Sequence, residues 1–144
     1  MIPNSELQNM DLIDLVSERH TQLRKLTEKA WNEESDIPIS NSEWYILARI
    51  YRSNHTIPQL TRTVNISRQA IHKFVKGLSA KGIVEILDAS DNKKEKIIRM
   101  TPLGNECYEK NEEMKARLVQ ELASNIGVEQ VETLKAILKL DWKL

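Results

Sequence analysis

The stretch NISRQAIHKFVKGLSAKGIV, residues 65–84, has no acidic residue and repeats its apolar positions at the spacing of a helix. On a helix with 3.6 residues per turn, one side carries the apolar residues Ala70, Ile71, Phe74, Val75 and Leu78. The other side carries Gln69, Lys73 and Lys76. This second face is either a solvated basic surface or a surface that binds DNA, and the neighbouring segments help to distinguish the two interpretations.

A shorter helix is predicted directly before this stretch. Thr56 and Gln59 have the spacing of a capping box, in which two side chains satisfy backbone N–H groups at the start of a helix. Ser67, or alternatively Asn65, can cap the helix that follows. Two short helices separated by a few residues, the second of them basic, are typical of a helix-turn-helix.

A pair of strands is predicted directly after the same stretch. Gly82 is a candidate for the left-handed residue that ends a helix. The segments IVEIL (83–87) and KIIRM (96–100) are rich in β-branched residues and flank the polar segment DASDNKKE, a predicted hairpin tip. Two strands with a charged tip after a helix-turn-helix predict a wing.

Longer helices are predicted on both sides of these elements. Apolar residues at helical spacing predict one helix over residues 5–31. Ser40 and Glu43 form a second capping box, which starts another helix. Thr101 and Pro102 begin a further long helix, and a last helix follows the break at NIG (125–127).

We therefore predict a mainly α fold with a small β-hairpin. A length of 144 residues suits a single domain, residues 1–144. Its winged helix-turn-helix lobe would cover residues 40–100, between the flanking helical segments 5–31 and 102–142.

The distribution of charge supports a phosphate-binding face, although the formal net charge of zero does not. Residues 52–99 carry ten Lys or Arg and four Asp or Glu, which is a net charge of +6. Residues 1–51 are net −4, and residues 100–144 are net −2. A basic middle between acidic flanks is typical of a localised nucleic-acid surface, and the alternative is a chance fluctuation on a solvated surface.

Composition predicts a cytoplasmic protein with no membrane partner. No apolar run approaches the ~20 residues that span a bilayer, and the acidic N-terminus does not resemble a signal peptide. The single cysteine, Cys107, excludes an internal disulfide framework and suits a reducing compartment. Its apolar position in a predicted helix favours a packed thiol over a redox sensor.

No enzyme site, metal or cofactor is expected. His20, His55 and His72 are isolated, with no carboxylate or cysteine at metal-ligand spacing. Four glycines in the whole chain form no phosphate-binding loop.

The order of elements and several motifs resemble the MarR family of transcriptional regulators over almost the whole chain. The most specific part lies in residues 66–104, ISRQAIHKFVKGLSAKGIVE and DNKKEKIIRMTPLG. It is similar to the family's serine-capped recognition helix, Leu-x-x-x-Gly-[Leu/Ile]-Val helix end, charged wing tip and Leu-Thr-x-x-Gly helix start. The matching residues after the capping serine are Leu78, Gly82, Ile83, Val84, Thr101 and Gly104, and Met100 replaces the usual leucine.

The chain departs from the family pattern at a few positions. ISNSEWYIL (39–47) resembles the family's second helix, with Glu43 in the place of a glutamine. In the wing, Lys94 takes the position of an arginine and Asn92 that of an aspartate. Gly77 lies inside the recognition helix, where a glycine costs roughly 0.5–1 kcal/mol relative to alanine.

The resemblance implies that the second helix of the motif enters the major groove of DNA. The residues expected to contact DNA are Ser67, Arg68, Gln69, His72, Lys73 and Lys76 in this helix and Lys93 and Lys94 at the wing tip. Arg and Gln can bind guanine and adenine bidentately, and lysines more often contact phosphates. A solvated basic helix face and a solubilising hairpin tip are the alternatives.

The resemblance also implies a homodimer, formed by the end helices, that binds a pseudo-palindromic operator in double-stranded DNA. It further implies a repressor relieved by a small phenolic or lipophilic effector. Candidates to line the effector pocket are His20, Arg24, Trp31 and Trp44, with ordinary core or surface positions as the alternative. The alternative function is a winged-helix module that binds an acidic protein partner instead of DNA.

Overall fold

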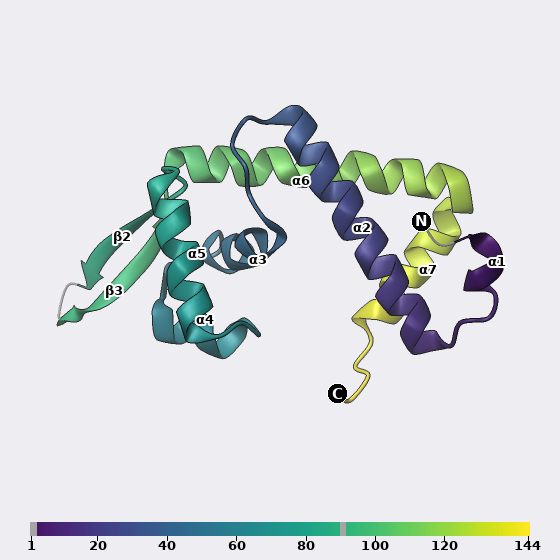
Figure 1. The fold of residues 1–144 in the computed structure, drawn as a ribbon, viewed down its shortest axis with the longest axis horizontal. Coiled ribbons are helices and arrows are strands. Elements are labelled where there is room, and N and C mark those ends of the chain that lie inside the picture. The colour runs from purple at the N-terminus through teal and green to yellow at the C-terminus, as the bar shows by residue number, and fades with distance from the viewer. Residues whose placement is uncertain (1–2, 90–91) are drawn as a thin grey trace. The chain divides into compact units, whose positions relative to one another are not determined.

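The computed structural model describes residues 3–89 and 92–144, with the backbone alone at residues 4, 89 and 92–94. Its elements, in chain order and as labelled in Figure 1, are α1 (Asn4–Leu7), α2 (Leu12–Glu34), α3 (Asn41–Ile50), β1 (His55–Thr56), α4 (Ile57–Thr63), α5 (Arg68–Ala80), β2 (Val84–Ala89), β3 (Asn92–Met100), α6 (Pro102–Ile126) and α7 (Val128–Lys139). This mostly helical chain with one small antiparallel sheet confirms the predicted fold class.

The prediction of one continuous helix over residues 5–31 was wrong. The short helix α1 ends at Leu7, and α2 begins only at Leu12 and continues to Glu34. Asp11 has extended backbone angles, and its carboxylate accepts the N–H of Asp14 at 2.9 Å. An aspartate at the N-cap stabilises the start of a helix. The apolar residues before and after Asp11 therefore belong to two separate helices.

Both predicted capping boxes are confirmed. In α3, Ser40 Oγ accepts the Glu43 N–H at 3.2 Å, and Glu43 Oε1 accepts the Ser40 N–H at 2.9 Å. In α4, Thr56 Oγ1 accepts the Gln59 N–H at 3.3 Å, and Gln59 Oε1 accepts the Thr56 N–H at 2.9 Å. These boxes fix the starts of the two helices that pack against α5.

Gly82 follows the C-cap of α5 and terminates the helix, as predicted. This glycine has a φ of +77°, a left-handed conformation that costs glycine no steric strain. Its N–H donates to the carbonyl of Ser79 at 3.0 Å, and the N–H of Ile83 donates to the carbonyl of Leu78 at 3.0 Å. This pair of bonds is a Schellman motif, and it turns the chain directly from α5 into β2.

The core of the winged-helix region includes the apolar face of α5. Ile71, Val75 and Leu78 are at most 2% exposed. Other core side chains come from α3, α4 and the sheet, and they include Ile46, Leu47, Ile50, Leu60, Ile83, Val84 and Ile98. Burial of these side chains leaves only one face of α5 open to solvent.

The sheet has three strands, in the order β1-β3-β2, where two strands were predicted. Strands β2 and β3 form the wing hairpin, with Ile86 opposite Ile98. The additional strand β1 pairs His55 with Ile98 and Thr56 with Ile97 on the other edge of β3. The sequence predicted only a helix start at His55 and Thr56. In the structure, Thr56 is both the last residue of β1 and the N-cap of α4.

Thr101 closes the base of the wing hairpin. Its N–H donates to the carbonyl of Ile83 at 3.1 Å, and its hydroxyl lies 2.5 Å from the carbonyl oxygen of Gly82. The same hydroxyl oxygen accepts the N–H of Gly104 at 3.0 Å. The residue that follows β3 is therefore bonded to the residues that lead into β2 and to the first turn of α6.

The chain divides into two compact units, one ending at Tyr108 and the other beginning at Glu109. The first unit contains the winged helix, and the second contains most of α6 and all of α7. The predicted break before the last helix is confirmed at Gly127, which has a φ of +105°. Among the described residues, no helix combines the length and the apolar character that crossing a membrane requires.

Candidate nucleic-acid interface

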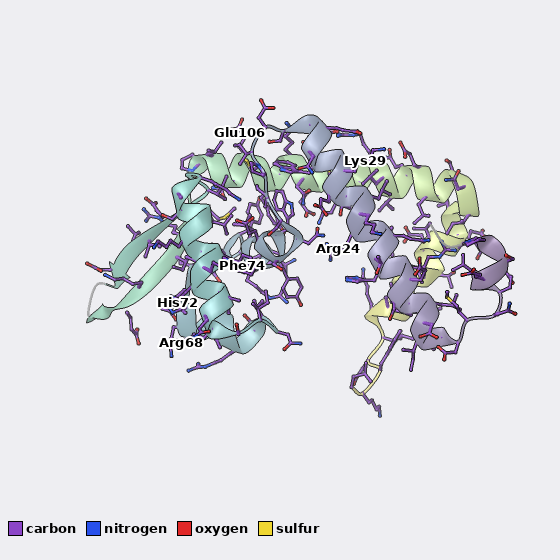
Figure 2. All side chains as sticks on the ribbon, viewed as in Figure 1. Arg24, Lys29, Arg68, His72, Phe74 and Glu106 are labelled. Atoms are coloured by element: carbon purple, nitrogen blue, oxygen red, sulfur yellow. The ribbon has the colours of Figure 1, made fainter. Side chains whose placement is uncertain are left out.

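The solvent face of α5 carries the predicted DNA-contacting residues of this helix. Arg68, Gln69, His72, Lys73 and Lys76 are all exposed, and their spacing places them along one side of the helix. Figure 2 shows Arg68 and His72 along the N-terminal half of α5. Because the opposite face is fixed in the core, this row of side chains is held toward solvent. We call these five residues the basic row.

Ser67 is the N-cap of α5, as predicted. Its Oγ accepts the N–H of Ala70 at 3.2 Å, and the residue itself is exposed. The alternative cap, Asn65, is not used. The remaining N–H groups of the first turn carry the positive end of the helix dipole, which favours an anion such as a phosphate nearby.

Three basic residues of the segment 52–99, which has a net charge of +6, form ion pairs with acidic residues. Lys81 pairs with Glu43, and Lys96 and Arg99 of β3 pair with Asp88 and Glu85 of β2. These partners could not be assigned from the sequence, because each pair joins two different elements.

Other basic residues keep their charge unpaired. Among the described side chains, Arg62, Arg68, Lys73 and Lys76 form no ion pair. Three of these four residues belong to the basic row, and Arg62 lies in the last turn of α4. Positive charge is thus concentrated on the helix-turn-helix.

Lys93 and Lys94 lie in the first part of strand β3. Their backbone belongs to the hairpin, and their side chains lie outside what the structure describes. Their contact with DNA stays a prediction from the sequence.

A cavity of about 550 Å³ lies between α2, the first turns of α3 and the turn between α4 and α5. Two of the four candidate pocket residues, His20 and Arg24, line it. The lining residues that were not predicted from the sequence are Thr21, Lys25, Glu28, Asn41, Ser42, Tyr45, Asn65 and Ile66. The lining comes from separate segments of the chain, and no local sequence signal joins them.

The other two candidates, Trp31 and Trp44, pack against each other. Their ring centroids lie 4.9 Å apart in an edge-to-face arrangement, and Trp31 Nε1 donates to the carbonyl of Ile37 at 2.7 Å. Trp31 is 1% exposed. Such pairs stabilise a core. This pair joins the end of α2 to α3, and the hydrogen bond to Ile37 joins it to the segment that leads into α3.

The described residues contain no group of three or more His, Cys, Asp or Glu side chains that could hold a metal ion. Cys107 is buried at 5% exposure, as its apolar position predicted.

Comparison with known proteins extends the similarity from the motif to most of the chain. Residues 36–94 match the sequence model of the MarR family. The reduced form of MarR from E. coli has the same fold, with a TM-score of 0.79 and 23% sequence identity, over 90% of this chain and 95% of that one. The chain is similar to the MarR family in its winged-helix region and shares the fold of the E. coli MarR structures.

Two further proteins are similar to this chain. An uncharacterised HTH-type transcriptional regulator, YdgJ of Bacillus subtilis (strain 168), is 27% identical over 93 residues. That match covers 64% of this chain and 57% of YdgJ, so the chain spans little more than half of the relative's length. A mutant of E. coli MarR complexed with operator DNA has a TM-score of 0.74 at 22% identity, over 92% of this chain and 94% of that one. The fold is that of the E. coli MarR structures.

Proposed function

We propose that this chain is a transcriptional regulator of the MarR family that binds a specific double-stranded operator through α5. The basic row carries the proposal, because it is exposed, lies on a helix whose other face is buried, and contains unpaired cations. A similar fold, that of the E. coli MarR mutant, is known in complex with operator DNA. Contacts from lysines and arginines to phosphates would release counterions, and Arg68 and Gln69 would read bases.

Exposed apolar side chains support assembly as a homodimer on a pseudo-palindromic operator. On α2, Leu12 and Ile13 are 69% and 76% exposed. On α7 and just after it, Leu138 and Leu140 are 56% and 66% exposed. Exposed apolar side chains that lie close together are typical of an interaction site. In a two-fold dimer, the apolar side chains of α2 and α7 would be covered in the same way on both chains.

The cavity beside α2 supports a response to a small phenolic or lipophilic effector. Arg24 and Lys25 offer cationic groups to an ionised phenol, His20 offers ring nitrogens for a hydrogen bond, and Tyr45 offers an aromatic ring. The same cavity is lined by Asn65 and Ile66, which lie just before α5. An effector bound in the cavity would therefore change the position of α5 relative to DNA. We propose that the effector releases a repressor from its operator.

Selection of duplexes from a random library, read by mobility shift, tests the function. We expect a pseudo-palindromic site whose affinity falls steeply as salt rises, because several phosphates are neutralised. A complex that is insensitive to salt, or no complex with any duplex, would contradict the proposal. The second outcome would favour the winged-helix module that binds a protein partner.

A further inference from the structure

A partly buried ion pair joins the C-terminal end of α5 to the first turn of α3. Lys81 Nζ lies 3.1 Å from both Oε1 and Oε2 of Glu43. The same ammonium group donates to the carbonyl of Pro38 at 2.6 Å. Glu43 is only 6% exposed, and a carboxylate is rarely so buried unless it is paired. Lys81 is therefore the partner that makes burial of Glu43 tolerable.

Glu43 has two structural roles at once. Its Oε1 also accepts the N–H of Ser40 in the capping box of α3. The ion pair thus connects three segments. Glu43 lies at the start of α3, Lys81 is the C-cap of α5, and the Lys81 ammonium also bonds to Pro38 in the link between α2 and α3. Local sequence patterns identify only the capping role, because Lys81 is 38 positions away along the chain.

Gly77 lies where α5 faces this carboxylate. A Cβ atom at this position would lie 3.9 Å from Glu43 Oε2, an ordinary van der Waals contact. Lys81 is one turn further along, and its N–H donates to the carbonyl of Gly77 at 3.1 Å. A methyl group fits here, but a larger side chain would enter the space of the ion pair. The glycine that departs from the family pattern therefore faces the glutamate that also departs from it.

We propose that Glu43 and Lys81 are positioning residues for DNA recognition, because their ion pair fixes the orientation of α5 and of the basic row that it carries. This inference rests on the proposed function that α5 binds DNA. Side chains that read bases must be held within about 0.5 Å of the productive geometry, so the end of α5 opposite its N-cap has to be fixed as well. Lys81 acts through Glu43 and Pro38 and needs no DNA contact of its own.

Four variants separate this role from simple stabilisation. Glu43→Gln keeps a side chain that can cap α3 but removes the charge, and Lys81→Met keeps the aliphatic stem. The double variant E43Q/K81M removes both charges, and Lys81→Arg can restore the pair. We expect K81M to lower the denaturation midpoint most, since it leaves a buried carboxylate uncompensated, and the double variant to recover much of that loss.

The affinity for the selected operator is the decisive measurement, made at a temperature where every variant is folded. We expect the double variant to bind the operator about threefold to thirtyfold more weakly than the wild type, although its stability has recovered. K81R should restore wild-type affinity. If affinity returns together with stability in E43Q/K81M, the pair has only a structural role and the proposal is overturned.

Two controls keep the interpretation clear. Lys115→Met removes an exposed ion pair with Glu112 in α6, so it should change neither stability nor affinity appreciably. Hydrogen exchange of the free protein reports on α5 without DNA. If the wild type binds no duplex, the proposed function fails and the role in DNA recognition fails with it, and exchange then reports only whether the ion pair fixes α5. Faster exchange in the last turns of α5 in E43Q/K81M supports a positioning role, and unchanged exchange overturns it.

Discussion

At the scale of single residues, Gly104 allows α6 to begin close to the end of α5. A Cβ atom at this position would lie 2.1 Å from the carbonyl oxygen of Ile83, a distance at which backbone has to move. We expect Gly104→Ala to destabilise the protein by about 1–3 kcal/mol, in the range of overpacked core substitutions. Urea denaturation measures this. Wild-type stability would show that the backbone relaxes without cost.

Gly77 provides the opposite case in the same fold. A methyl group makes only an ordinary contact with Glu43 there, and alanine is the better helix former. We expect Gly77→Ala to stabilise the protein by about 0.5–1 kcal/mol, whereas Gly77→Leu should destabilise it by displacing the carboxylate. The same denaturation series compares both variants with G104A. A destabilising alanine would show that α5 and α3 lie closer together than described.

At the scale of elements, two substitutions of Ser67 can distinguish its role as the N-cap of α5 from a contact with DNA. Ser67→Ala removes the hydroxyl that accepts the Ala70 N–H, which should cost about 1 kcal/mol of stability. Ser67→Asp keeps a capping oxygen but adds a negative charge at the proposed DNA surface. We therefore expect S67D to retain stability and to bind the operator more weakly. Equal operator affinity of S67D and wild type would remove Ser67 from the interface.

In the wing, two sets of substitutions can distinguish Lys94, a predicted DNA contact, from Lys96, which is paired with Asp88. Lys94→Ala should reduce the slope of log affinity against log salt by about one unit if this lysine contacts a phosphate. The double variant D88A/K96A removes the ion pair of the hairpin without changing net charge, so its slope should match the wild type. Both slopes come from salt titrations of the selected duplex. An unchanged slope in K94A would indicate that the wing tip is only solvated.

At the scale of the whole molecule, the exposed apolar side chains of α2 and α7 predict that the functional species is a dimer. Leu138→Glu places a charge in the apolar surface of α7 and should yield a monomer. Loss of one of two linked binding modules lowers operator affinity by about a hundredfold or more. Light scattering after size-exclusion chromatography measures the mass, with Glu132→Gln as a control on the polar face of α7. A wild-type monomer at micromolar concentration would contradict the dimer.

Local signals in the sequence were sufficient to predict most elements of this fold. Ser40 with Glu43, and Thr56 with Gln59, define helix starts within four residues, and Gly82 defines a helix end. Each of these signals acts between neighbours in the chain, so the sequence displays it directly.

Features that depend on distant residues could not be predicted in the same way. Strand β1 has two residues, and it exists because β3 pairs with it. The partners of Lys81, Lys96 and Arg99 lie on other elements, so the sequence could count cations but not show which remain unpaired. For the candidate site, the basic row was therefore visible in the sequence, but the ion pair that supports α5 was not.

The closed base of the hairpin has an evolutionary consequence. Because Thr101 bonds to Gly82 and Ile83, the two ends of the wing cannot move apart when its length changes. Insertions and deletions between β2 and β3 must be accommodated at the tip. Natural selection, or an engineer grafting a tip from a protein of similar fold, can therefore vary that segment without altering α5 or the start of α6.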